Sequence, residues 1–141
     1  MSLQVEQLEL CNSISRTINE LSRSVKDLSK PYLTDLTLIE PIHKYLQEQL
    51  AGKPYNISCR VELMILLYLF SPMLIVSRKH ESNCAFGEIA KVMGIQNSNL
   101  SKYKTTILPY YKTYRDFREL TDMIYDDVVK KIAENTLFEN Q

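Results

Sequence analysis

Several features that define common protein classes are scarce in this chain of 141 residues. Glycine occurs three times and proline five times, which argues against a turn-rich β architecture and favours long helices. The three cysteines are an odd number without close spacing, so they predict neither a disulfide framework nor a paired metal knuckle. The apolar content of 45% is ordinary for a globular protein and argues against disorder throughout.

The motifs that mark common enzymes are also missing. The sequence contains no glycine-rich phosphate loop, no HExxH zinc motif and no GxSxG nucleophile turn. His80 and Cys84 have a spacing compatible with a metal, but further ligands would have to come from the distant His43 and Cys59. We therefore expect no catalytic activity, no metal and no cofactor, and we interpret the cysteines as small buried groups or reduced thiols.

No segment of the sequence predicts contact with a membrane. The longest apolar run, at residues 61–70, is shorter than the roughly 20 residues that a membrane-spanning helix needs. The N-terminus, MSLQVEQLELCNS, carries acids and lacks the basic start and apolar core of a signal peptide. We expect a cytoplasmic protein.

Charge is unevenly distributed along the chain, although the formal net charge is zero. Residues 53–118 contain ten Lys and Arg residues against four acids, a net charge of +6. Residues 1–52 carry five against seven, or −2, and residues 119–141 carry two against six, or −4. A positive segment inside a neutral chain is the pattern that binding to phosphate requires, whereas the alternative is a solvated surface.

Residues 86–105, FGEIAKVMGIQNSNLSKYKT, predict two short helices joined by a tight turn at Gly94. Left-handed backbone at the end of the first helix has a low energetic cost only for glycine. The apolar residues on either side have the spacing of two inner helix faces that pack together. They are Ile89, Ala90, Met93, Ile95, Leu100 and Tyr103.

This stretch resembles the helix-turn-helix DNA-binding unit of small transcription regulators. The resemblance implies that the second helix, at about residues 97–108, enters the major groove of double-stranded DNA. It departs from the pattern at Gln96, where Ser or Thr usually caps the second helix, so Asn97 is the expected cap. The outer face of that helix carries no Arg. The residues expected to contact bases or the groove are Asn97, Ser98, Ser101, Lys102 and Thr105.

Four further cations are expected to contact the DNA backbone. Lys91 and Lys104 belong to the two predicted helices, and Arg78 and Lys79 belong to the polar loop that precedes them. The alternative for the loop is a solvated surface segment without a partner.

The N-terminal segment has a heptad pattern. Its apolar residues recur at alternating steps of three and four, with polar residues between them, as in a coiled-coil seam. They are Cys11, Ile14, Ile18, Leu21, Val25 and Leu28. A helix of this length is marginally stable alone, so its seam must be buried. Either the residues from Ile14 to Leu28 pair with a second copy in a homodimer, or the helix lies back on its own domain.

The remaining segments also predict helices. Pro41 suits the first turn of a short helix that ends at Gly52. Ser58 is a plausible cap for a helix at residues 59–70, which is apolar nearly all round and therefore expected at the centre of the core. After Pro109, apolar spacing predicts a final helix that runs to about Glu134.

We therefore predict an all-α protein with a helix-turn-helix-containing helical domain and an N-terminal coiled-coil-like helix. The expected divisions are an amphipathic helix at 1–30, a connector and short helix at 31–52, the helical domain at 53–134 and a frayed tail at 135–141. The predicted function is DNA binding in transcription regulation, by a homodimer that reads the major groove. The alternative is a non-enzymatic protein-interaction module that uses the N-terminal helix, with the two later helices serving only packing.

Overall fold

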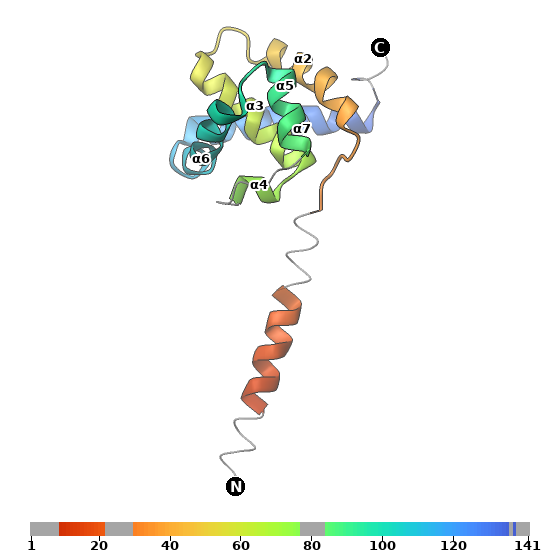
Figure 1. The fold of residues 1–141 in the computed structure, drawn as a ribbon, viewed down its shortest axis with the longest axis vertical. Coiled ribbons are helices and arrows are strands. Elements are labelled where there is room, and N and C mark those ends of the chain that lie inside the picture. Colours follow the sequence, from red (N-terminus) through yellow and green to blue (C-terminus); the bar gives the residue numbers. More distant parts are fainter. Residues whose placement is uncertain (1–8, 22–29, 77–83, 136, 138–141) are drawn as a thin grey trace. The chain divides into compact units, whose positions relative to one another are not determined.

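The structure is a computed structural model that describes residues 9–21, 30–76, 84–135 and 137 (Figure 1). The chain divides into two compact units, residues 1–30 and residues 31–141. Within the first unit, residues 9–21 form a helix, as the heptad pattern predicts.

Helices are the regular secondary structure of the described part of the second unit. It begins with a short 3-10 helix, η1 (Leu36–Leu38), followed directly by α2 (Ile39–Gln49). The helices α3 (Tyr55–Phe70), α4 (Met73–Val76), α5 (Cys84–Met93), α6 (Asn97–Thr113) and α7 (Arg115–Ala133) follow in order. Because the described residues form no strand, the all-α prediction is confirmed over that part of the chain.

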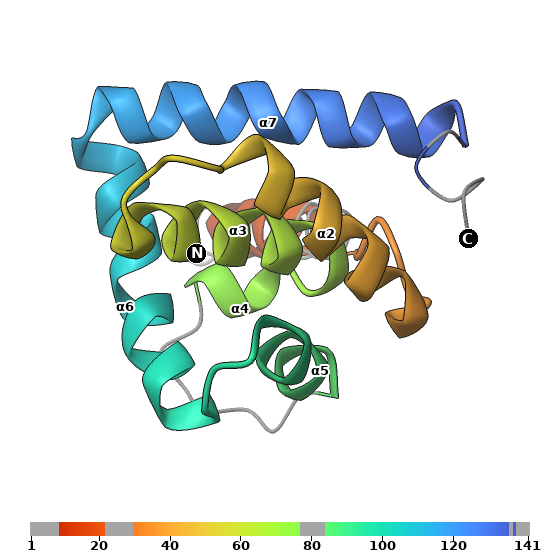
Figure 2. The same cartoon turned by 90° about the horizontal axis from the view of Figure 1, so that it is seen from above.

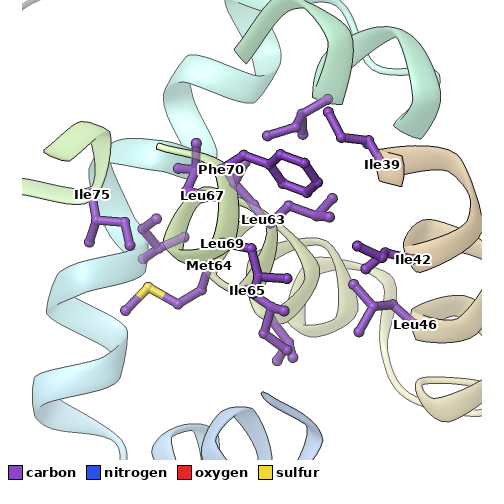
Figure 3. Close-up of a cluster of buried hydrophobic side chains, with 14 of the residues drawn as sticks. Ile39, Ile42, Leu46, Leu63, Met64, Ile65, Leu67, Leu69, Phe70 and Ile75 are labelled. Atoms are coloured by element: carbon purple, nitrogen blue, oxygen red, sulfur yellow. The ribbon is translucent and has the colours of Figure 1, made fainter. Parts of the chain in front are cut away.

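Helix α3 is the centre of the core. It contacts α2, α4, α5, α6 and α7, and its residues from Val61 to Leu67 are all buried. Figure 3 shows Leu63, Leu67 and Phe70 of α3 among side chains from other elements, including Ile39 and Ile42 of α2. A helix with apolar side chains on every face can be stable in water only when other elements cover it on every side. The prediction that residues 59–70 form the central core helix is therefore confirmed.

The covering helices place α5 and α7 on opposite sides of α3 (Figure 2). Helix α7 runs along one side of the unit, and α6 meets its N-terminal end at a corner. Helix α6 then extends along the end of α3 toward α5. The segment expected as a connector and short helix supplies α2, whose Ile39, Ile42 and Leu46 are fully buried in the same core.

The expected start of α3 is wrong. The helix begins at Tyr55, with Pro54 in the N-cap position, and Ser58 lies inside its first turns. The Ser58 hydroxyl donates back to the carbonyl oxygen of Pro54, 3.1 Å away, and so it does not cap the helix. Serine can bond the preceding turn in this way within a helix, which is why its presence alone did not define the boundary.

The expected break at Pro109 is also wrong. Helix α6 continues through Pro109 to Thr113, and the chain turns at Tyr114, where the backbone is extended at φ −101° and ψ 108°. Proline inside a helix costs about 3 kcal/mol because it removes one hydrogen bond and crowds the preceding turn. Here packing outweighs that cost, because α6 buries Leu100 and Ile107 on the core and Pro109 lies on the exposed side. The final helix therefore begins at Arg115.

Two glycines of the α5 region give a matched test of backbone conformation. Gly94 has φ +71°, whereas Gly87 lies within α5 without positive φ, and a Cβ atom at either position meets nothing within 4 Å. We expect Gly94→Ala to lower the free energy of unfolding by about 1 kcal/mol, because a left-handed conformation strains any residue with a Cβ atom. We expect Gly87→Ala to raise it by about 0.5–1 kcal/mol, because alanine favours the helix. Urea unfolding of both variants measures the effects, and equal signs would contradict this account of the turn.

Candidate nucleic-acid interface

The turn between α5 and α6 is fixed by its backbone hydrogen bonds. The amide of Ile95 donates to the carbonyl oxygen of Ala90 at 3.0 Å, and the amide of Gly94 donates to that of Lys91 at 3.2 Å. With Gly94 at φ +71°, this is the Schellman arrangement that ends many helices. The left-handed conformation predicted for Gly94 is confirmed, and the turn sets the direction in which α6 leaves α5.

The residues predicted to contact the groove lie together on α6. Asn97, Ser98, Lys102 and Thr105 are exposed, and Ser101 is half-buried. Their spacing of three and four residues puts them along one side of the helix. The buried residues Leu100 and Ile107 occupy the other side, against the core.

The start of α6 differs from the predicted cap. Asn97 is the first residue of the helix, and Gln96 occupies the N-cap position with extended backbone and no side-chain hydrogen bond to the helix. Asn97 is therefore not the cap, because the chain already turns into the helix one residue earlier. The first amides of α6 lack a capping side chain, and such amides can bind an anionic group such as a phosphate.

The structure describes two of the four residues that are predicted to contact phosphate. Lys91 is exposed in the last turn of α5, and Lys104 is half-buried on α6. Arg78 and Lys79 lie outside the described residues. Helix α6 also carries the exposed Lys102 and Lys112, and its sequence contains no acid. The helix is therefore cationic along its length.

Arg60, one of the ten cations of the positive segment, anchors α6 to α3. Its Nε donates to the hydroxyl oxygen of Thr106 at 2.8 Å, and one terminal nitrogen donates to the carbonyl oxygen of Asn56 at 3.0 Å. The guanidinium carbon also lies 5.0 Å from the ring centre of Tyr103 and 4.4 Å from that of Tyr110. Arg60 thus places its positive charge beside α6, where its side chain is held by hydrogen bonds and by the two aromatic rings.

The helix at residues 9–21 cannot bury its own apolar face. Leu10, Ile14, Ile18 and Leu21 are between 51% and 61% exposed, and Cys11 is exposed as well. Val25 and Leu28, the other predicted dimerisation residues, lie outside the described residues. Nothing within residues 9–21 can bury this stripe, since a single helix cannot pack on itself.

Sequence reasoning missed a polar cluster between α2 and α3 that is centred on the buried Glu62. Glu62 is 1% exposed, and its carboxylate accepts a hydrogen bond of 3.0 Å from the amide nitrogen of Gln47. The second carboxylate oxygen contacts Nδ1 of His43. Burial raises the pKa of Glu62 above its ordinary value, and the hydrogen bonds from His43 and Gln47 oppose that rise. The signal was the single charge inside the apolar run of residues 61–70.

This cluster has no features of a metal centre. Within the described ranges, no group of three or more His, Cys, Asp and Glu residues is arranged to hold a metal ion. Cys59, which the sequence placed among distant possible ligands, is buried, and burial raises the pKa of its thiol. His43 contacts Glu62, so the cluster joins two helices.

Comparisons with known proteins found no match among family models, curated proteins or solved structures. The function therefore has to be argued from the residues themselves. Among the described residues, none of the helices combines the length and the apolar content that crossing a bilayer requires.

The raised pKa of Glu62 predicts a pH-dependent stability. The folded protein holds the proton of this carboxyl more tightly than the unfolded chain, in which the pKa is about 4.5. The stabilising contribution of the protonated form is therefore complete below pH 4.5 and is lost as pH rises through the raised folded pKa. We expect the free energy of unfolding of the wild type to fall over that range relative to that of Glu62→Gln.

Urea unfolding at a series of pH values checks this prediction. Glu48→Gln, the same substitution at an exposed position on α2, is the matched control. Because the interaction with His43 lowers the pKa of Glu62, the comparison is repeated in a His43→Asn background, where the dependence on pH should be larger. Parallel stability curves for the wild type and Glu62→Gln would contradict the proposed role of burial.

Proposed function

We propose that the protein binds double-stranded DNA with the exposed side of α6 and acts in transcription regulation. The observation that carries the proposal is the exposed side of α6. Asn97, Ser98, Lys102 and Thr105 line it, no acid interrupts it, and a fixed turn and the anchor at Arg60 hold it. A helix of about 10–12 Å diameter fits a major groove about 12 Å wide.

The side chains on this face have the chemistry that groove recognition uses. Asparagine forms paired hydrogen bonds with adenine edges, lysine contacts guanine or phosphate, and serine and threonine bond either bases or backbone. Because Asn97 and Ser98 occupy the first turn of α6, their side chains and the uncapped amides lie at the same end of the helix. Lys91, in the last turn of α5, is close in sequence to that end and supports contact with phosphate.

The distribution of acids is consistent with this surface. Most acids of residues 119–141 belong to α7, which lies across α3 from α5 (Figure 2). Helix α7 contains five acids against four Lys and Arg residues, whereas α6 contains three Lys residues and no acid. The excess of positive charge on α6 favours approach of a polyanion to that helix.

The exposed stripe at residues 9–21 supports a homodimer. A second copy of the same helix would cover Leu10, Ile14, Ile18 and Leu21 in the manner of a coiled coil. A two-fold dimer would present two copies of α6 to successive major grooves, about 34 Å apart. The same stripe also favours the second candidate function, a protein-interaction module in which the helix recruits a different protein.

Titration of mixed-sequence duplex DNA, followed by fluorescence anisotropy at about 50 and about 200 mM salt, tests the proposal. We expect binding at the lower salt that weakens steeply at the higher salt, because phosphate contacts release counterions. Lys102→Ala should weaken binding and reduce the slope of log affinity against log salt by about 0.9 for a phosphate contact. Lys130→Ala, at an exposed position on α7, is the matched control and should leave the slope unchanged.

Absence of binding at both salt concentrations would favour the interaction module, since even non-specific DNA-binding proteins register at low salt. An unchanged slope for Lys102→Ala, with binding intact in the wild type, would remove only Lys102 from the phosphate contacts.

Sedimentation velocity tests the homodimer separately from DNA binding. We expect a species of twice the chain mass of 16.5 kDa for the wild type and a monomer for the double variant Ile14→Ser, Ile18→Ser. Replacing these two side chains removes apolar surface from the centre of the stripe. The control double variant Ser15→Ala, Asn19→Ala changes polar positions of the same helix and should remain dimeric. A monomeric wild type at about 100 μM, well above the dissociation constants of stable dimers, would contradict the dimer.

A further inference from the structure

A groove of about 400 Å³ opens between α3, α6 and α7. Its volume lies within the range of about 300–1,000 Å³ that small-molecule sites have. The buried side chains of Met64 and Ile65, from α3, supply part of an apolar lining. The rest of the lining is mostly tyrosine and aspartate, so the groove combines aromatic rings with carboxylates.

Three tyrosines line the groove, one from each helix. Tyr68 of α3 and Tyr125 of α7 meet edge to face, with ring centres 5.1 Å apart and ring planes at 84°. Both residues line the groove. Tyr68 is half exposed and can therefore meet a ligand from solvent. Tyr111 contributes the third ring, from α6.

Two carboxylates accompany the rings. Asp122 and Asp126 are exposed, lie four residues apart on α7 and both line the groove. Asp122 accepts a hydrogen bond of 2.6 Å from the hydroxyl of Tyr111, and this bond raises the pKa of Tyr111 to about 12. Neither carboxylate forms an ion pair with a residue that the structure describes. Like charges at this spacing repel each other, so a cation between them and the rings would be favourable.

We propose that this groove binds an alkylammonium group. The faces of aromatic rings attract cations, and cages of aromatic rings are a known solution for binding quaternary ammonium. The apolar lining suits the methyl groups of such a cation, and Asp122 and Asp126 complement its charge. An anionic or phosphorylated ligand would meet the two carboxylates and is disfavoured. The proposal does not depend on DNA binding, because none of the groove residues belongs to the exposed side of α6.

The alkylammonium has two possible sources, a free small molecule and a methylated lysine of another protein. The test therefore uses two probes, choline and N-acetyl-trimethyllysine amide, titrated into the ¹⁵N-labelled full chain up to about 20 mM. We expect saturable shifts of the backbone amide signals of Thr121, Asp122, Tyr125 and Asp126. Preferential binding of choline indicates a free ligand, preferential binding of the lysine derivative indicates a protein side chain, and either supports the site.

The neutral isostere of choline, 3,3-dimethylbutan-1-ol, has the same shape but no charge. It therefore distinguishes the contribution of charge to binding from that of shape. It should bind at least fivefold more weakly than choline, because it lacks the attraction of the rings and carboxylates for a cation. Equal binding of the isostere, or no saturable shift with either cation, would overturn the proposal.

Substitutions localise the effect. Tyr68→Ala should weaken choline binding about fivefold to tenfold, whereas Tyr68→Phe, which keeps the ring face, should retain most of it. Asp126→Asn should weaken binding about twofold to fivefold, which is the range for an exposed ion pair. Asp116→Asn makes the same change of charge on α7 outside the groove and should have no effect. Equal affinity of Tyr68→Ala and the wild type would overturn the site even if choline binds elsewhere.

Discussion

Burial of the central turns of α3, from Val61 to Leu67, is the constraint on which the rest of the folded unit depends. A helix whose residues from Val61 to Leu67 are all buried cannot form alone in water, so five other helices must pack around it. That requirement places α5 and α7 on opposite sides and puts α6 across one end. It also explains why α6 tolerates Pro109, since the apolar area that α6 buries on α3 outweighs one lost hydrogen bond.

Polar groups at the surface of α3 fix how its neighbours dock. On one side, Glu62 joins α3 to α2 through His43 and Gln47, and on another side Arg60 joins α3 to α6. Hydrophobic contact is non-directional, whereas hydrogen bonds require a defined geometry. These hydrogen bonds therefore favour one alignment of each pair of helices. Arg60 matters most for the proposed interface, because it holds the inner side of α6 while Asn97, Ser98 and Lys102 of the outer side are exposed.

The two sides of α6 carry different functional groups. The outer side carries amide, hydroxyl and ammonium groups suited to DNA, and the inner side contributes Tyr111 to a groove suited to an organic cation. DNA requires a positively charged surface and an organic cation requires a negatively charged one, so a surface of uniform charge could not bind both. The acids of α7 make this division possible, because Asp122 and Asp126 line the groove beside α6.

Four features could be predicted from the amino-acid sequence: the helical class, the central place of residues 59–70, the turn at Gly94 and the common side of Asn97, Ser98 and Lys102. Each of these follows from local periodicity or from the conformational freedom of glycine. Sequence patterns did not predict the helix boundaries at Tyr55 and Tyr114, the burial of Glu62, the hydrogen bonds of Arg60 or the tyrosine groove. These features depend on contacts between residues far apart in the chain, and such contacts leave no periodic signal in a single sequence.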